Sequence, residues 1–237
     1  MGIEYNKTKL IELRRKLHQF PELSGEEYET AKIIKQALLK CKPDKIIENL
    51  GGNGIAAVFN GQEAGPSVMF RCDMDALPIL ETNQFQYKSS NRGTAHKCGH
   101  DGHMTIMIGI AEAILNDPPQ KGRIILLFQP SEENGQGAGK VLDDKKFQTI
   151  QPDFVFALHN LPGYPEGAIV LREGIFAAAS KGMINRLYGK TSHAGEPENG
   201  NSPALAMADI IKALSFLPQN NYFEDFTLVT VIHSKLG

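Results

Sequence analysis

Hydrophobic residues near the N-terminus follow the spacing of two amphipathic helices. Leucine and isoleucine over residues 7–19 predict a helix that must end before Pro21. A second apolar stripe, over residues 24–39, predicts another helix. Ser24-x-x-Glu27 at its start is a capping-box pattern, in which the two side chains satisfy backbone N–H groups of the first turn. We expect both stripes to face a hydrophobic core.

Further along, short apolar runs bounded by glycine, proline and asparagine turns predict strands. The expected strands cover residues 45–47, 54–59, 67–72, 122–128 and 154–158. A helix over residues 104–115 is apolar on most faces and should be deeply buried. Nearly continuous apolar strands among such helices are typical of a mainly parallel sheet covered on both faces, so the pattern predicts an α/β fold.

The pattern changes after about residue 174. The expected elements there are a strand over 176–188, a helix over 204–217, a polar link over 218–224 and a strand over 226–233. Strand, helix and strand with longer loops suggest a smaller α+β segment with its own core. We therefore expect residues 1–176 to form one domain and residues 177–237 to belong to another.

Acidic residues and a histidine follow the apolar strands directly. Two pairs of acids and one histidine stand at these ends: Asp73 and Asp75, Glu132 and Glu133, and His159. In open α/β sheets ligands bind beyond the carboxyl ends of strands, so these residues are candidates for a site. The alternative is that the acids are solvated turns or helix caps.

Three of the seven histidines and one of the three cysteines stand together in the stretch His96-Lys97-Cys98-Gly99-His100-Asp101-Gly102-His103. Thiolate and imidazole bind zinc-like cations well. We expect Cys98 and His100 to be ligands, Asp101 to cap or support the following helix, and His96 and His103 to have supporting roles. The alternative is a surface turn that is rich in histidine.

Composition narrows the class of protein. The chain has 237 residues, of which 41% are hydrophobic, and a net charge of −2. It has no basic block, no apolar leader region and no run of about 18 apolar residues, so we expect a cytoplasmic protein that binds neither nucleic acid nor membrane. The odd number of cysteines argues against a disulfide framework, and Cys41 and Cys72 are expected to pack in the core.

The candidate ligands combine sulfur, nitrogen and oxygen. The set is Cys98, His100, Glu133 and His159. Carboxylate ligands and open positions distinguish catalytic metal sites from closed structural ones, and a bridging ligand can hold two cations for hydrolysis. Glu132, beside Glu133, would then be placed to act as the general base. A structural zinc or redox protein is a weaker alternative.

Several motifs carry a resemblance to a known family. They are Arg14-x-x-Leu17-His18-Gln19-x-Pro21-Glu22, Asp73-Met74-Asp75-Ala76-Leu77-Pro78, His96-x-Cys98-Gly99-His100-Asp101-Gly102-His103, Pro130-x-Glu132-Glu133 and His159-Asn160-x-Pro162. With these motifs the chain resembles the metal-dependent amidohydrolase family of hippurate hydrolases, N-acyl-amino-acid aminoacylases, N-acetyldiaminopimelate deacetylases and auxin-conjugate hydrolases. The resemblance implies a zinc-peptidase-like catalytic domain with a smaller lid and dimerisation domain.

The resemblance also implies roles for single residues. The ligands of a two-metal centre, holding Zn, Mn, Ni or Co, would be Cys98, His100, Glu133 and His159. Glu132 would be the general base, and Asp75 would orient a ligand. The turn around His193 resembles the family's Gly-Gly-His-Ala turn in the lid, whose histidine reaches a neighbouring subunit's site and steadies the substrate carbonyl. The expected substrate is a small N-acyl amino acid or short peptide-like amide, and the expected assembly is a homodimer.

Two departures from the family pattern affect this expectation. The turn continues with Pro197-Glu198 and Ser202-Pro203 where the family has Pro-His and Asp-Pro. Family members are also longer, with a second lid half and a returning segment that supplies a last histidine ligand. After His193 this chain has only His233. We therefore expect a C-terminally truncated chain, and the alternative function is a non-catalytic metal-binding fragment of such an enzyme.

Overall fold

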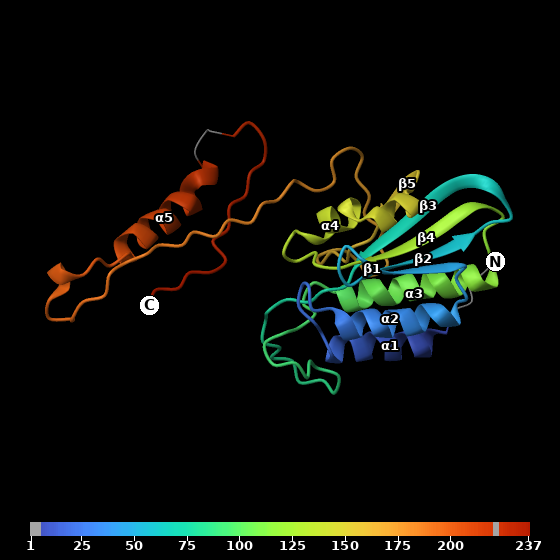
Figure 1. Cartoon of the computed structure of the whole chain (residues 1–237), viewed down its shortest axis with the longest axis horizontal. Coiled ribbons are helices and arrows are strands. Elements are labelled where there is room, and N and C mark those ends of the chain that lie inside the picture. The colour runs from blue at the N-terminus through green and yellow to red at the C-terminus, as the bar shows by residue number, and fades with distance from the viewer. Residues whose placement is uncertain (1–5, 220–222) are drawn as a thin grey trace. The chain divides into compact units, whose positions relative to one another are not determined.

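The structure is a computed structural model that describes residues 6–219 and 223–237. Figure 1 labels the helices (α) and strands (β), and the short 3-10 helices are named η. In chain order the elements are α1 (Lys7–Gln19), α2 (Tyr28–Lys40), β1 (Lys45–Leu50), β2 (Gly54–Asn60), β3 (Glu63–Asp73), α3 (His100–Asn116), β4 (Lys121–Gln129), α4 (Gly137–Asp143), η1 (Lys145–Ile150), β5 (Phe154–Ala157), η2 (Pro197–Asn199), α5 (Ala204–Phe216) and η3 (Leu217–Gln219). The chain divides into two compact units, Met1–Gly182 and Met183–Gly237. The assignment of residues 1–176 and 177–237 as catalytic and lid domains stays a prediction.

The strands form one five-stranded sheet in the order β1-β2-β4-β3-β5. β3 pairs in parallel with β4 and with β5, whereas β2 runs antiparallel to β1 and β4. Within this sheet only β2 therefore points the other way. Pairing of Cys72 with Phe128 and of Arg71 with Ala157 brings the ends of three parallel strands to one edge. In the edge strand β5, Phe154, Val155 and Phe156 are more than half exposed.

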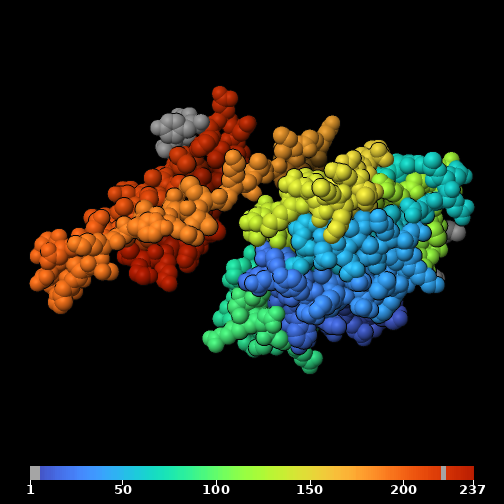
Figure 2. Space-filling view, viewed as in Figure 1, coloured from blue at the N-terminus to red at the C-terminus, as the bar shows by residue number. Residues whose placement is uncertain are grey.

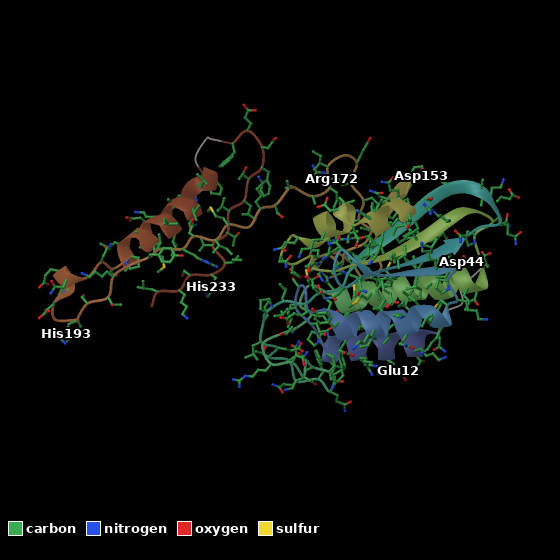
Figure 3. The ribbon with its side chains drawn as sticks, viewed as in Figure 1. Glu12, Asp44, Asp153, Arg172, His193 and His233 are labelled. Carbon is green, nitrogen blue, oxygen red and sulfur yellow. The ribbon has the colours of Figure 1, made fainter. Side chains whose placement is uncertain are left out.

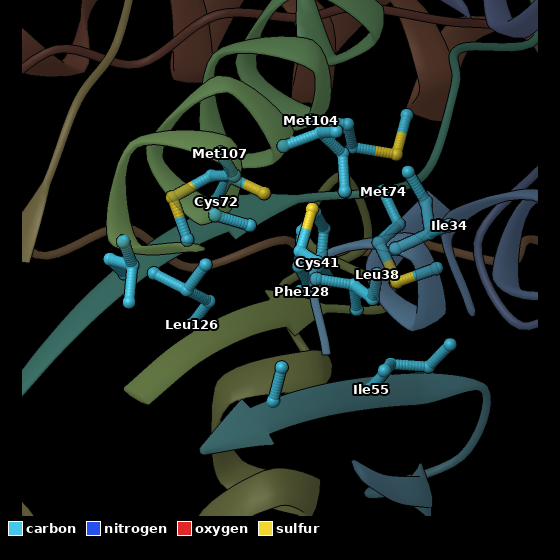
Figure 4. Packing of buried hydrophobic residues seen from close by; sticks show 14 of the residues in the cluster. Ile34, Leu38, Cys41, Ile55, Cys72, Met74, Met104, Met107, Leu126 and Phe128 are labelled. Atoms are coloured by element: carbon cyan, nitrogen blue, oxygen red, sulfur yellow. The ribbon is translucent and has the colours of Figure 1, made fainter. Parts of the chain in front are cut away.

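Helices cover both faces of the sheet (Figure 1), as predicted for this α/β class. Alternation along β4 sends Leu126 to a core with Met107 of α3 and Leu127 to a second core with Val141 of α4. Figure 4 shows the larger core, where α2 and α3 pack against the sheet. None of the helices in the described parts of the chain is long and apolar enough to span a membrane.

The surface over the second core is continuous. In Figure 2 the surface of residues 45–60 (blue) adjoins that of residues 140–150 (yellow-green). The ammonium group of Lys146 in η1 donates to the backbone carbonyls of Glu48, at 2.9 Å, and of Asn49, at 3.0 Å. These bonds fix η1 against the end of β1.

Cys41 and Cys72 are both buried in the larger core, which confirms the prediction that they pack (Figure 4). Burial raises the pKa of the Cys41 thiol to about 11, and burial raises the pKa of Cys72 well above its ordinary value. Both side chains therefore stay protonated at neutral pH and behave as small apolar groups.

The predicted capping box at the start of α2 is not formed. The helix begins at Tyr28, and Glu27 in the N-cap position makes no capping bond with its side chain. Instead, the carboxylate of Glu22 accepts the backbone N–H groups of Glu29 and Thr30, at 3.1 and 2.7 Å. Because another acid satisfies these groups, the side chains of Ser24 and Glu27 are free for contacts elsewhere.

The unit Met183–Gly237 is built around α5, which confirms the helix predicted over residues 204–217. The strands predicted over 176–188 and 226–233 are not formed, because neither segment builds a hydrogen-bonded ladder with a neighbour in the described structure. Residues 220–222 of the predicted polar link lie outside the described residues.

Candidate metal centre at the carboxyl end of the sheet

Side chains from separate segments gather at the edge where the parallel strands end. Asp73 ends β3, His100 begins α3, and the Glu132-Glu133 pair and His159 follow β4 and β5. Because β3, β4 and β5 run in parallel, the loops after them share this edge. The structure thus brings together the residues predicted to form the site: Cys98, His100, Glu132, Glu133 and His159.

His100 lies at the centre of this group and is fully buried. Its Nδ1 is 2.8 Å from the carbonyl oxygen of Asp75, so Nδ1 carries the proton and donates it. The lone pair on Nε2 then faces carboxylates, with Glu133 Oε1 at 3.7 Å, Asp73 Oδ2 at 3.8 Å and Glu132 Oε2 at 3.9 Å. A neutral imidazole fixed in this way is the form that binds a metal.

Cys98 and His159 complete the group of side chains at this edge of the sheet. The Sγ atom of Cys98 is 3.6 Å from Nε2 of His159, whose Nδ1 is 2.8 Å from the carbonyl oxygen of Asn160. Three groups each offer ligand atoms within 4.8 Å of one another: Cys98, His100 and His159; His100, Glu132 and Glu133; and Asp73, His100 and His103. His100 belongs to all three groups, so they form one cluster.

The chemistry of this cluster fits divalent cations. His100 Nε2 and Glu133 Oε1 are buried and have no hydrogen-bond partner in the described structure. Buried polar atoms without partners are costly, and a cation would satisfy both. Thiolate, imidazole and carboxylate together suit Zn and the neighbouring transition metals.

The electrostatics of the cluster also favour a bound cation, because several acids lie close together in a half-buried space. Burial, reinforced by the charges of Glu133 and Glu132, raises the pKa of the Cys98 thiol to about 12. Burial raises the pKa of Asp73 to about 6 and also raises the pKa of Glu133. Burial lowers the pKa of His100, but hydrogen bonding to Asp75 and the charge of Asp73 outweigh it, so that this pKa is raised. Positive charge is therefore favoured here.

Asp75 connects the segments of the site. Its Oδ2 accepts hydrogen bonds from the Ser24 hydroxyl at 2.6 Å and from the Glu133 backbone N–H at 2.9 Å. Although burial opposes it, these bonds and the contact with His100 lower the pKa of Asp75. Ser24 was missed as a site residue because Ser-x-x-Glu was interpreted as a helix cap.

Asp101 does not cap α3, so that part of its prediction was wrong. Gly99 is the N-cap residue, and α3 begins at His100 rather than at residue 104. The carboxylate of Asp101 instead lies 3.0 Å from Nδ1 of His18 and accepts from Arg14 Nε at 3.2 Å. It therefore supports the first turn of α3 by tying it to α1.

His96 and His103 are both buried, as their expected supporting roles require. Burial lowers the pKa of each to about 4. His103 Nε2 lies 2.6 Å from Oδ1 of Asn160, which connects α3 to the loop that carries His159. His103, for which a supporting role was expected, also belongs to one of the candidate ligand groups.

Gly99 explains how Cys98 and His100 reach the same cluster. Its φ of 91° lies in the left-handed region, which favours glycine. A Cβ atom at this position would overlap Oδ1 of Asn160. Glycine therefore permits both the turn into α3 and the close approach of the loop after β5.

His193 lies in the unit Met183–Gly237, at a bend before η2, where its side chain is exposed (Figure 3). Its Nδ1 accepts a hydrogen bond from the Gly195 backbone N–H at 3.1 Å. This bond shapes the turn locally. The catalytic role predicted for His193 stays a prediction.

Known proteins share this sequence and fold. Over 213 residues the chain is 40% identical to an N-acetyl-L-cysteine deacetylase of Bacillus subtilis, covering 90% of this chain and 50% of that protein. It is 34% identical over 212 residues to an N-acetyldiaminopimelate deacetylase of Halalkalibacterium halodurans, covering 90% and 57%. The chain thus spans about half the length of these curated relatives.

A solved structure shows similarity in both fold and sequence. A Bacillus subtilis protein described as a dinuclear metal-binding peptidase of the M20 family superimposes with a TM-score of 0.65 at 38% identity, covering 70% of this chain and 47% of that one. Residues 69–230, which include the whole candidate metal cluster, match Peptidase family M20/M25/M40. The family resemblance of the sequence is thereby confirmed: the chain belongs to the peptidase family M20/M25/M40.

Proposed function

We propose that this chain carries the catalytic centre of a metal-dependent amidohydrolase that cleaves the amide bond of small N-acyl amino acids. The observation that carries the proposal is the more exposed position of Glu132 within the cluster. Its Oε2 is 3.9 Å from His100 Nε2, and its side chain is 39% exposed, against 16% for Glu133. Glu133 is thus held among the ligands, while Glu132 can reach an incoming substrate.

The proposed ligands follow from the same geometry. Cys98, His100, Glu133 and His159 would hold two divalent cations, with Zn, Mn, Ni and Co as candidates. The chemistry that such a cation pair supplies when bound is polarisation of the amide carbonyl and a lowered pKa of water. Asp75 keeps His100 in the tautomer with a free Nε2 and holds the backbone of Glu133.

Glu132 is the proposed general base. It takes a proton from the attacking water as the water oxygen bonds to the acyl carbon. When the carbon–nitrogen bond breaks, Glu132 delivers that proton to the departing nitrogen. The products are a carboxylate and a free amino acid, in keeping with the deacetylase activity of the relatives.

Residues 177–237 are proposed to be the first half of a lid and dimerisation domain. There His193 would steady the substrate carbonyl oxygen in a partner subunit's site. Support comes from the family resemblance of the turn around His193 and from the exposure of that side chain.

The test compares purified wild-type chain with Glu132→Gln after loading with Zn, Mn, Ni or Co. Wild type should release amino acid from N-acetyl-L-cysteine, N-acetyldiaminopimelate or hippurate. Glu132→Gln should lower kcat by about 100-fold or more while the metal content stays the same. Glu12→Gln, which changes an exposed acid of α1, is the matched control and should behave as wild type.

Equal rates for wild type and Glu132→Gln would show that Glu132 is not the general base. Stoichiometric metal binding without turnover in any of the loaded samples would favour the non-catalytic metal-binding fragment instead.

A further inference from the structure

We propose that Glu27 is a positioning residue that sets the direction of Glu132 and Glu133 by holding the backbone of Ser131. The inference rests on the roles given to Glu132 and Glu133 in the proposed function. The capping of α2 does not require the Glu27 side chain, because the Glu22 carboxylate accepts the N–H groups in the first turn of that helix.

The carboxylate of Glu27 is fully buried at the end of β4. Its Oε1 accepts the backbone N–H of Ser131 at 2.7 Å and lies 3.5 Å from the Ser131 hydroxyl, while Oε2 accepts from Asn53 Nδ2 at 3.1 Å. No lysine or arginine within residues 6–219 and 223–237 forms a salt bridge with it. A buried carboxylate kept by backbone and amide donors alone is a specific and strong acceptor.

Ser131 needs such an acceptor. Its φ of 53° lies in the left-handed region, which serine adopts only when its surroundings impose it. The next two residues are Glu132 and Glu133, so this backbone angle decides where both acids point. On the other side of the turn, Gly137 N–H donates to the Ser131 carbonyl at 2.9 Å. Glu27 therefore holds one of the two ends of the turn.

Ser24 adds an independent observation. Its hydroxyl donates to Asp75 at 2.6 Å, and Asp75 in turn accepts from Glu133 N–H. The connection between α1 and α2 thus reaches both loops of the site, at the end of β3 through Ser24 and at the end of β4 through Glu27. The Ser-x-x-Glu motif acts on the metal centre and not on its own helix.

The test uses the full chain and Co²⁺ alone as the probe, followed by its absorption spectrum. Glu27→Ala should weaken Co²⁺ binding by about 10- to 100-fold, as loss of partners that orient ligands does. Glu27→Gln should have a smaller effect, because its amide oxygen can still accept from Ser131, and it carries the test if Glu27→Ala does not fold. Exchange of the Ser131, Glu132 and Glu133 amide protons should become faster in both variants.

A second substitution separates positioning from general stability. Glycine adopts the left-handed conformation freely. The double variant Glu27→Ala/Ser131→Gly should therefore bind Co²⁺ several-fold more tightly than Glu27→Ala alone. The matched control is Glu22→Gln, an acid of the same connection whose side chain, among the residues that the structure describes, hydrogen-bonds only to the start of α2. It should lower stability while changing Co²⁺ affinity by less than about twofold.

Wild-type Co²⁺ affinity and wild-type amide exchange in Glu27→Ala or Glu27→Gln would overturn the proposal. An equal loss of affinity in Glu22→Gln, or no recovery by Ser131→Gly, would also overturn it. If the wild-type chain hydrolyses no amide while the Co²⁺ and exchange results come out as expected, the proposed function fails and the role of Glu27 stands.

Discussion

The backbone N–H of Glu133 donates to the carboxylate of Asp75 over 2.9 Å, although the two residues are 58 positions apart. Asp75 also receives Nδ1–H of His100 on its carbonyl oxygen. One buried residue thus fixes a candidate ligand on α3 and another in the loop after β4. The arrangement makes Asp75 a sensitive place to perturb the centre without removing a ligand.

Asp75→Asn should weaken Zn²⁺ binding by about 10-fold or more, because the neutral amide is a weaker acceptor for Glu133 N–H and removes negative charge beside His100. A competition titration with a chromophoric chelator measures this. Ser24→Ala, which removes only one hydrogen bond to Asp75, serves as the milder comparison. Equal affinities in Asp75→Asn and wild type would show that Asp75 does not organise the ligands.

Gly99→Ala and Gly93→Ala form a matched pair. Both glycines have positive φ, 91° and 83°, so alanine should cost about 1 to 2 kcal/mol at either position. Only at Gly99 would the new Cβ also meet the side chain of Asn160, whereas nothing lies within 4 Å at Gly93. Urea unfolding should therefore show a loss for Gly99→Ala that is larger by about 1 kcal/mol or more. Equal losses would contradict the close packing of Asn160.

Glu81 should make stability depend on acid pH. Although burial opposes it, the Lys97 ammonium and hydrogen bonds from Ser89, Asn83 and His18 lower its pKa from 4.5 to about 2. Since the pKa is lower in the folded state, the contribution is complete above about pH 4.5 and disappears as the pH falls towards 2. At neutral pH, Glu81→Gln should lower the free energy of unfolding by about 1 to 3 kcal/mol.

The control for Glu81 is Glu63→Gln, whose partner Lys121 lies 3.0 Å away in an exposed pair. Exposed pairs contribute about 1 kcal/mol at most. Denaturant unfolding at several pH values measures both variants. A Glu81→Gln protein with the same pH dependence as wild type would remove Glu81 as its source.

Metal binding should release a proton from Cys98. Burial and the neighbouring acids raise its pKa to about 12 in the absence of a cation, whereas a coordinated cysteine is a thiolate. Affinity should therefore rise with pH, and calorimetry in buffers of different ionisation enthalpy should detect the released proton. Cys98→Ser should release fewer protons and bind more weakly. Proton release that Cys98→Ser leaves unchanged would exclude the thiol as its origin.

The sequence predicted the sheet and the edge that carries the site, because both depend on local patterns. Apolar runs identified the strands, and the residues after them had to meet where parallel strands end. The Cys98–His100 pair was found because ligand types stand so close together in the chain. These features need no knowledge of distant contacts.

What the sequence missed depends on such contacts. Ser24 and Glu27 match a capping box, and only the folded chain shows that their partners are Asp75 and Ser131. The strand expected over residues 176–188 has the right alternation but no strand to pair with in the described structure. Local pattern identifies residues that can make an interaction, and tertiary structure selects the partner.

The contacts of the α1–α2 connection also determine when the centre can assemble during folding. Ser24 meets Asp75 across 51 positions, and Glu27 meets Ser131 across 104. Because both contacts close long loops, we expect them to form late in folding. Opening of this short connection alone would then release both loops together, so proteolysis or hydrogen exchange there should report on the integrity of the whole centre.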